Sequence, residues 1–190
     1  MSIKEEIGEF VLKRIRELDE ETPYARASLA KLRRVAGKNP SETPEVWGIT
    51  LRGGLLSSDA IEAIHTALAL YAVHRQSKQK SMHLEGQSLG KAARVLIWKD
   101  KDGNREEAIT RRFNAIASAG DLIELSRHAR GLVQLLRSED IELDYVQFAR
   151  ELYSFGRYAD SRPGIRLKWG KDFYSLKPDT EKNEEENQDE

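Results

Sequence analysis

The four histidines are the side chains best suited to bind a metal ion or to carry a proton near neutral pH. His65, His74 and His83 follow one another at intervals of nine residues, whereas two ligands on one helix face need a spacing of three or four. Only Glu62 and Glu85 stand near them as carboxylate ligands, and the chain has no cysteine. We therefore interpret the histidines, with His128, as surface or half-buried residues and expect no metal site.

Sequence signatures of other catalytic sites are also missing. Gly53-Gly54 lacks the GK[ST] or GxGxxG context of a phosphate-binding loop, and the chain has neither a serine elbow nor an HEXXH motif. Glu106 and Glu107 fall in the first turn of a predicted helix, where the helix dipole favours acidic residues without any catalytic role. We expect no catalytic residue and no cofactor.

Clusters of arginine and lysine give a stronger chemical signal. Residues 22–99 contain 12 basic and 5 acidic side chains, a net charge of +7. The guanidinium group of arginine forms paired hydrogen bonds with phosphate oxygens, so an arginine-rich surface is suited to nucleic-acid backbones. Any single arginine is more simply explained as a solvated surface residue. Taken as a group, the arginines favour binding of the phosphate backbone without reading of bases.

Charge is segregated along the rest of the chain. Residues 1–21 have a net charge of −3, residues 100–176 have 13 basic and 13 acidic side chains, and residues 177–190 have a net charge of −5. The total of −1 does not argue against a polyanionic partner, because local potential matters more than the sum. The polar, acidic composition of residues 177–190 predicts a disordered tail.

Hydrophobic periodicity indicates the elements that position these charges. Apolar residues recur at helical spacing in nearly every segment, Thr22-Pro23 and Thr43-Pro44 are helix start signals, and no segment alternates with period two. The sequence predicts an all-α fold, a compact helical bundle of about eight helices in two lobes. The lobes are residues 1–98, with a basic face, and residues 104–176. Residues 75–87 are predicted to form a mobile loop. The residues expected to be largely buried are Trp47, Leu68, Phe113, Leu132, Leu152 and Trp169.

Composition places the chain among charged, water-soluble domains. Hydrophobic residues make up 39% and charged residues 33% of the 190 residues, against usual values of roughly 45–50% and 25%. No stretch approaches the ~20 apolar residues of a membrane span, and no signal peptide is recognised. We expect a cytoplasmic protein that does not associate with membranes.

Several segments, in this order and spacing, resemble one protein family. They are LAKLRRVAG (29–37), SLGKAA (88–93), RRFNAI (111–116), LVQLL (132–136), LDYVQFARELYSFG (143–156) and RLKWGKDFY (166–174). Together they are similar to the CasB-type small subunit of Cascade, the type I-E CRISPR surveillance complex. The resemblance extends over about residues 23–174.

The resemblance implies a non-enzymatic, two-lobed helical subunit of an RNA-guided complex that targets invading DNA. Two copies are expected to lie head to tail beside Cas7-type backbone subunits and the large subunit. Basic surface would hold the duplex of guide RNA and target DNA, and the displaced non-target strand, while the guide RNA reads sequence.

Where motifs of this chain match those of the family, the resemblance assigns the nucleic-acid-binding role to particular residues. Arg34 in LRRV is the leading candidate, with Arg33 beside it, and Lys91 follows the SLG motif. Arg111 and Arg112 form the RR pair, and the more loosely aligned segments add Arg130 and Arg157. The resemblance predicts that these side chains form one continuous exposed surface.

Two other classes of function are compatible with parts of the sequence. A free-standing helical adaptor or scaffold would use its arginines only in surface salt bridges and would not bind nucleic acid. A metal-dependent nuclease would need clustered carboxylates, which the sequence does not display.

Overall fold

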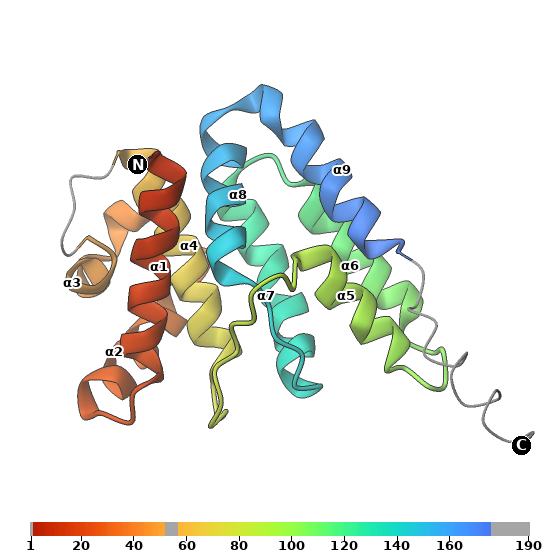
Figure 1. The fold of residues 1–190 in the computed structure, drawn as a ribbon, viewed down its shortest axis with the longest axis horizontal. Helices are drawn as coiled ribbons and strands as arrows, with labels where there is room; N and C mark the ends of the chain where they lie inside the picture. The colour runs from red at the N-terminus through yellow and green to blue at the C-terminus, as the bar shows by residue number, and fades with distance from the viewer. Residues whose placement is uncertain (1, 52–56, 176–190) are drawn as a thin grey trace, which may run out of the picture.

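The computed structural model describes residues 2–51 and 57–175, and these residues form an all-α fold (Figure 1). The α-helices are α1 (Ile3–Asp19), α2 (Pro23–Val35), α3 (Trp47–Thr50), α4 (Ser58–His74), α5 (Leu89–Trp98), α6 (Glu106–Ser118), α7 (Leu122–Ser138), α8 (Tyr145–Arg157) and α9 (Arg162–Phe173). Short 3₁₀ turns occupy Pro40–Glu42, Pro44–Val46 and Ala159–Ser161. The predicted fold class is therefore confirmed. Two sequence predictions, the helix end at Gly53-Gly54 and the disordered tail, lie outside the described residues.

Polar side chains determine where the longer helices begin. Ser2 forms a capping box with Glu5 at α1, and Thr22 caps α2 immediately before Pro23. Ser88 and Asp121 cap α5 and α7 through backbone amides three residues later. Each cap satisfies an amide that has no partner inside its helix, so the start signals in the sequence correspond to real helix ends.

Helix α4 is the centre of the molecule. It packs against α1, α2, α7 and α8, and its residues from Ala63 to His74 are all buried. The sequence predicted one apolar stripe on this helix, facing one side. The structure buries it on all sides, because alanines at 63, 67, 69 and 72 let neighbouring helices approach closely.

The two halves of the chain share this core. Helix α7 packs against both α4 and α6, α8 packs against α1 and α4, and α5 packs against α9 (Figure 1). Contacts therefore cross the turn at 99–105 where the two lobes were expected to meet. A division into units of 1–98 and 104–176 stays a prediction.

Five of the six residues expected in the core are buried: Leu68, Phe113, Leu132, Leu152 and Trp169. The prediction for Trp47 is wrong, since its side chain is 42% exposed. Its indole Nε1 donates a hydrogen bond to the carbonyl of Pro40, 2.8 Å away, across the outside of the molecule. Helix α3 has only four residues, so its apolar pattern was too short to specify which side faces the core.

The connection between α4 and α5 is irregular, as predicted, but it is tied to the turn between α7 and α8. The amide of Leu84 donates to the carbonyl of Leu143, and the amide of Leu143 donates to the carbonyl of Met82. Lys78 forms an ion pair with Asp140 at 2.6 Å. The sequence did not predict this anchoring, because its partners lie about sixty residues away along the chain.

A buried carboxylate organises the interface between α8 and α9. Glu151 accepts hydrogen bonds from Trp169 Nε1 at 2.6 Å, Lys168 Nζ at 2.7 Å and Gln147 Nε2 at 2.8 Å. Trp169 is fully buried, with its ring near those of Phe148 and Phe155. The indole N–H therefore has its only hydrogen-bond acceptor, among the residues described, in Glu151.

Replacing Glu151 by alanine should lower the free energy of unfolding by about 3 kcal/mol, because it leaves a buried N–H donor without a partner. Glu151→Gln keeps an oxygen acceptor and should lose less than half of that amount. Urea denaturation followed by circular dichroism measures both. Equal losses for the two variants would show that the hydrogen bond to Trp169 is not the stabilising interaction.

Because one histidine, His74, is buried, we expect the fold to be less stable at acidic pH. The interpretation of the histidines as surface or half-buried residues is wrong for His65 and His74, which are 1% and 0% exposed. Nδ1 of His74 lies 3.0 Å from the hydroxyl of Tyr145, and burial lowers the pKa of His74 to about 4. The unfolded chain binds this proton at about pH 6.5, so stability is complete above that pH and falls as the pH drops to about 4. The loss should reach about 3 kcal/mol.

Urea denaturation between pH 7.5 and pH 4 measures the effect of His74. A His74→Gln variant should show a flatter pH profile, whereas the exposed His128→Gln should leave the profile unchanged. An identical slope in the wild type and in His74→Gln would contradict the assignment.

Candidate nucleic-acid interface

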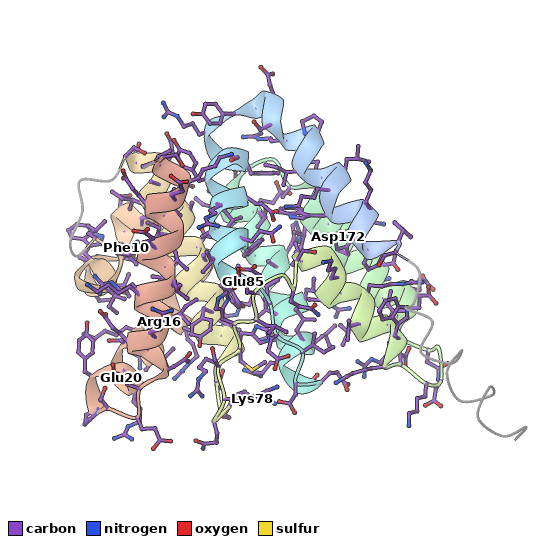
Figure 2. All side chains as sticks on the ribbon, in the orientation of Figure 1. Phe10, Arg16, Glu20, Lys78, Glu85 and Asp172 are labelled. Carbon is purple, nitrogen blue, oxygen red and sulfur yellow. The ribbon has the colours of Figure 1, made fainter. Side chains whose placement is uncertain are left out.

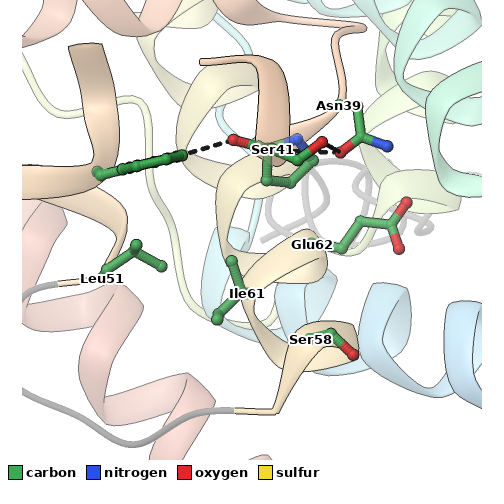
Figure 3. Close-up of a pocket in the computed structure, with 8 residues that line it drawn as sticks. Asn39, Ser41, Leu51, Ser58, Ile61 and Glu62 are labelled. Atoms are coloured by element: carbon green, nitrogen blue, oxygen red, sulfur yellow. Dashed lines mark hydrogen bonds between the residues drawn. The ribbon is translucent and has the colours of Figure 1, made fainter. Parts of the chain in front are cut away.

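No catalytic centre is evident in the described part of the chain. Residues 2–51 and 57–175 contain no group of three or more His, Asp or Glu side chains that could hold a metal ion. A cavity of about 390 Å³ beside Trp47 is lined by Leu51 and Ile61, with Glu62 at its edge (Figure 3). Asn39, Ser41 and Ser58 also line it, and Asn39 and Ser41 are hydrogen-bonded to each other. No nucleophile and base are paired there. None of the helices described is both long and apolar enough to span a membrane.

Two of the candidate arginines lie in the last turn of α2. Apolar residues of α2, including Leu32 and Val35, face the core, which leaves Arg34 exposed and Arg33 half-buried. Partial burial lowers the pKa of Arg33, and the neighbouring charges of Arg137 and Arg34 act in the same direction. The charge of Arg137, on α7, therefore acts on Arg33 in the last turn of α2.

Helix α7 carries arginines at positions 127, 130 and 137, which share one side of the helix because the spacing is three and seven residues. Arg127 Nε donates a hydrogen bond to the carbonyl of Gly37, 3.3 Å away. Gly37 has a φ of +83° and ends α2 in the left-handed conformation that glycine adopts readily. Arg127 therefore connects α7 to the residue that follows α2.

Helix α6 adds Arg112 to the same region. Its Nε lies 3.7 Å from the position that a Cβ atom would occupy on Gly131, the residue after Arg130. Close packing of α6 and α7 thus brings Arg112 against α7 at Gly131. The absence of a side chain at position 131 leaves room for the guanidinium group to lie across α7.

We call this group of six side chains the arginine belt: Arg33, Arg34, Arg112, Arg127, Arg130 and Arg137. Their hydrogen bonds in the described structure go to uncharged groups, such as the carbonyl of Ala108 for Arg112 and Gln76 for Arg137. Within that structure, no carboxylate lies within salt-bridge distance of any of the six. The belt can therefore offer several guanidinium groups to phosphate oxygens without breaking ion pairs.

The remaining candidates lie apart or carry other interactions. Lys91 is exposed on α5, where its Nζ donates to the carbonyl of Gly86, 3.2 Å away. Arg111 is exposed on α6 beside Arg112. Arg157, at the end of α8, forms an ion pair with Asp59 at 2.5 Å and lies over the ring of Tyr158. Four of the seven predicted residues, Arg33, Arg34, Arg112 and Arg130, thus lie on α2, α6 and α7 without ion-pair partners in the described structure, and a role for all seven stays a prediction.

Sequence reasoning did not select two members of the belt, Arg127 and Arg137. Arg127 was visible as a basic residue on the α7 segment, and its spacing to Arg130 and Arg137 was an available signal. What the sequence lacked was the relative position of α2 and α7, which both pack against α4, with Arg127 reaching the carbonyl of Gly37 just after α2.

The SLG segment has a structural role in addition to any role in binding. Ser88 caps α5 and its hydroxyl donates to Asp172 at 2.5 Å, while Leu89 is buried. Gly90 is buried where α5 meets α9, so that any Cβ at this position would overlap the backbone of α9. Two of the segments noted in the sequence, SLGKAA and RLKWGKDFY, therefore occur together because they pack against each other.

Solved structures of known proteins have a similar fold. The structure of CasB from Thermobifida fusca is 35% identical in sequence, with a TM-score of 0.74 over 89% of this chain and 98% of that one. A CRISPR-associated protein of the Cse2 family from Thermus thermophilus is 20% identical, with a TM-score of 0.69 over 89% and 98%. A chain in a structure described as a CRISPR RNA-guided surveillance complex is 21% identical, with a TM-score of 0.72 over 90% and 93%.

A search of curated protein sequences found no match. The family model of CRISPR-associated protein Cse2 matches residues 28–174, which include α3 to α9, most of α2 and every member of the arginine belt. This match, with the likeness to the Thermobifida CasB, confirms the resemblance noted in the sequence. The chain belongs to the CRISPR-associated Cse2 family.

Proposed function

We propose that this chain is the non-catalytic small subunit of a cytoplasmic type I-E Cascade complex, in which it holds nucleic-acid backbone through the arginine belt. One observation supports the proposal: the six arginines of the belt, on α2, α6 and α7, have no carboxylate at salt-bridge distance in the described structure. Arginines kept only for stability would be expected to face acidic residues, as Arg157 faces Asp59.

The chemistry of the belt fits phosphates better than bases. Guanidinium groups on rigid helices present donors at fixed positions, and their charge attracts any strand regardless of sequence. The belt has no exposed aromatic side chain among its members on which a base could stack. Sequence recognition is accordingly assigned to the guide RNA, and the protein supplies charge and shape.

We propose partners that are supported by the family and by likeness to a chain of a surveillance complex. They are the Cas7-type backbone subunits, the large subunit, a second copy of this chain, the guide RNA, and the target and non-target DNA strands. We further propose that Lys91, Arg111 and Arg157 contact nucleic acid or neighbouring subunits only within the assembled complex.

Copurification tests the assignment to Cascade. The tagged chain, expressed with the other Cascade subunits and a guide RNA, should elute in an assembly that contains RNA and binds target DNA. Elution of the chain alone, while the other subunits assemble without it, would favour the adaptor function instead.

Salt dependence tests the binding mode of the isolated chain. Affinity for a single-stranded DNA oligonucleotide should fall steeply with salt, by about 0.7 in log K per unit of log salt for each phosphate contact. Four contacts in the belt predict a slope of about −3. Fluorescence anisotropy with two oligonucleotides of different sequence measures the slope and the expected lack of preference. An affinity unchanged between low and physiological salt would contradict the proposal.

A further inference from the structure

The cavity beside Trp47 has no member of the arginine belt in its described lining. Its walls are the 3₁₀ turn after α2, helix α3 and the start of α4. Trp47, Leu51 and Ile61 supply an apolar lining, and the hydrogen bond from the indole Nε1 to the carbonyl of Pro40 fixes the orientation of the ring. Leu51 and Glu62 stand on opposite sides of the view in Figure 3. The cavity therefore combines an aromatic and aliphatic wall with one carboxylate.

Glu62 is the charged residue of this lining, and no cation of the described structure is paired with it. Its side chain is half-buried, and no described lysine, arginine or histidine lies within salt-bridge distance. Burial raises the pKa of Glu62, and the negative charges of Asp121 and Asp59 raise it further. Asp59 forms an ion pair of its own, with Arg157. The charged form of Glu62 therefore lowers the stability of the fold at neutral pH.

An unpaired carboxylate beside an aromatic ring is suited to one class of ligand. The carboxylate can accept charged hydrogen bonds from a guanidinium or ammonium group, while the alkyl stem of an arginine or lysine side chain covers an apolar wall. Phosphate groups would be repelled by Glu62, Asp59 and Asp121, which disfavours nucleic acid at this place. Partly exposed tryptophan is typical of the energetic centres of protein interfaces, which favours a side chain of another protein over a free small cation.

We propose that this cavity binds an arginine or lysine side chain of a neighbouring protein subunit, with Trp47 and Ile61 against the stem and Glu62 as the counter-charge. The inference rests on the proposed function for the source of that side chain, because membership of a complex supplies the neighbouring subunit. The chain then has two contacts of opposite charge. The arginine belt binds phosphates, and the cavity binds a cationic group of a protein.

Small probes test the cavity in the isolated chain. The n-butylguanidinium ion has the stem and head group of an arginine side chain, and n-butylurea has the same shape without the charge. Butylguanidinium should shift the NMR signal of the Trp47 indole N–H, and Glu62→Gln should weaken this binding about tenfold. The indole signal of the fully buried Trp169 should not move. Equal shifts with butylurea, or no shift with either probe, would overturn the proposal.

The stability of the Glu62→Gln variant separates binding from folding. The amide removes a charge that burial and two neighbouring acids disfavour, so the variant should unfold in urea at the same or a higher concentration than the wild type at about pH 7.5. Glu9→Gln makes the same change on the exposed side of α1 and should leave probe binding unaltered. A clearly less stable Glu62→Gln variant would show that Glu62 serves the fold, and would overturn its assignment as a counter-charge.

Retention in the assembled complex tests the source of the cationic side chain. The wild-type chain and the Trp47→Leu, Glu62→Gln and Glu9→Gln variants are each expressed with the other Cascade subunits and a guide RNA. Dissociation of the chain from the washed complex should be about tenfold faster for Trp47→Leu and Glu62→Gln. The Glu9→Gln control should dissociate like the wild type. The isolated Trp47→Leu chain should keep the wild-type affinity for DNA, because Trp47 is not part of the belt.

The two kinds of measurement distinguish this inference from the proposed function. Binding of butylguanidinium together with unchanged retention of both cavity variants would overturn the assignment to a neighbouring subunit. Failure of the wild-type chain to enter a guide-RNA complex would overturn the proposed function and, with it, the source of the side chain. In that case the probe measurements still decide whether the cavity binds a cationic group.

Discussion

A Gly90→Ala variant is expected to lose about 3 kcal/mol of unfolding free energy, because a single methyl group at this position has no space. An ideal Cβ at Gly90 would lie 2.9 Å from the amide nitrogen of Phe173 and 2.8 Å from Cβ of Asp172, and it would overlap the carbonyl oxygen of Trp169. Two of these atoms belong to the backbone of α9, so the clash is relieved only by moving the whole helix. The larger Gly90→Val change should prevent α9 from docking.

Thermal and urea denaturation measure the loss. Gly170→Ala is the matched control on α9, since a Cβ there meets nothing within 4 Å and should add up to about 1 kcal/mol of helix stability. Lys91→Glu, at the exposed residue after Gly90, should leave stability within about 0.5 kcal/mol. If Gly90→Ala were as stable as the wild type but bound DNA poorly, the SLG segment would be part of the binding surface rather than of the α5–α9 contact.

The double charge reversal R34E/R112E is expected to weaken DNA binding about tenfold or more at low salt, and to reduce the salt slope by about 1.5. These two residues are exposed and come from different helices, α2 and α6. Neither has an ion-pair partner in the described structure, so the change should leave helix content and unfolding free energy nearly unaltered.

The matched control for this variant is K13E/R16E, which makes the same change of charge on exposed residues of α1; Figure 2 labels Arg16 there. Electrophoretic mobility shift and anisotropy should show near wild-type affinity for the control, both for the isolated chain and for the complex. A loss of equal size in the two double variants would mean that total charge, and not the belt, determines binding.

Local chemistry explains how much of the fold the sequence determined. Caps at Thr22, Ser88 and Asp121, the glycine after α2, and apolar residues at helical spacing specified the helices and most of the core. These signals act within a few residues of each other, so they are visible in a linear sequence. The order of the motifs along the chain likewise indicated the family, because that order goes with one arrangement of packed helices.

The sequence could not specify which helix faces meet. The four-residue α3 has too few apolar positions to fix its orientation, and Trp47 lies on the outside as a result. The connection formed by residues 75–88 is hydrogen-bonded to residues near 143. The composition of neither segment indicates that the two are in contact.

The same limit applies to the candidate site. The residue types and the local excess of positive charge predicted a surface for phosphates, and residues such as Arg34 and Arg112 could be chosen from motifs. Only the packing of α2 and α7 on α4, and of α6 on α7, decided which arginines have no carboxylate beside them and that Arg157 pairs with Asp59. An arginine's role depends on whether a carboxylate lies within a few ångströms, and that distance is a property of the tertiary structure.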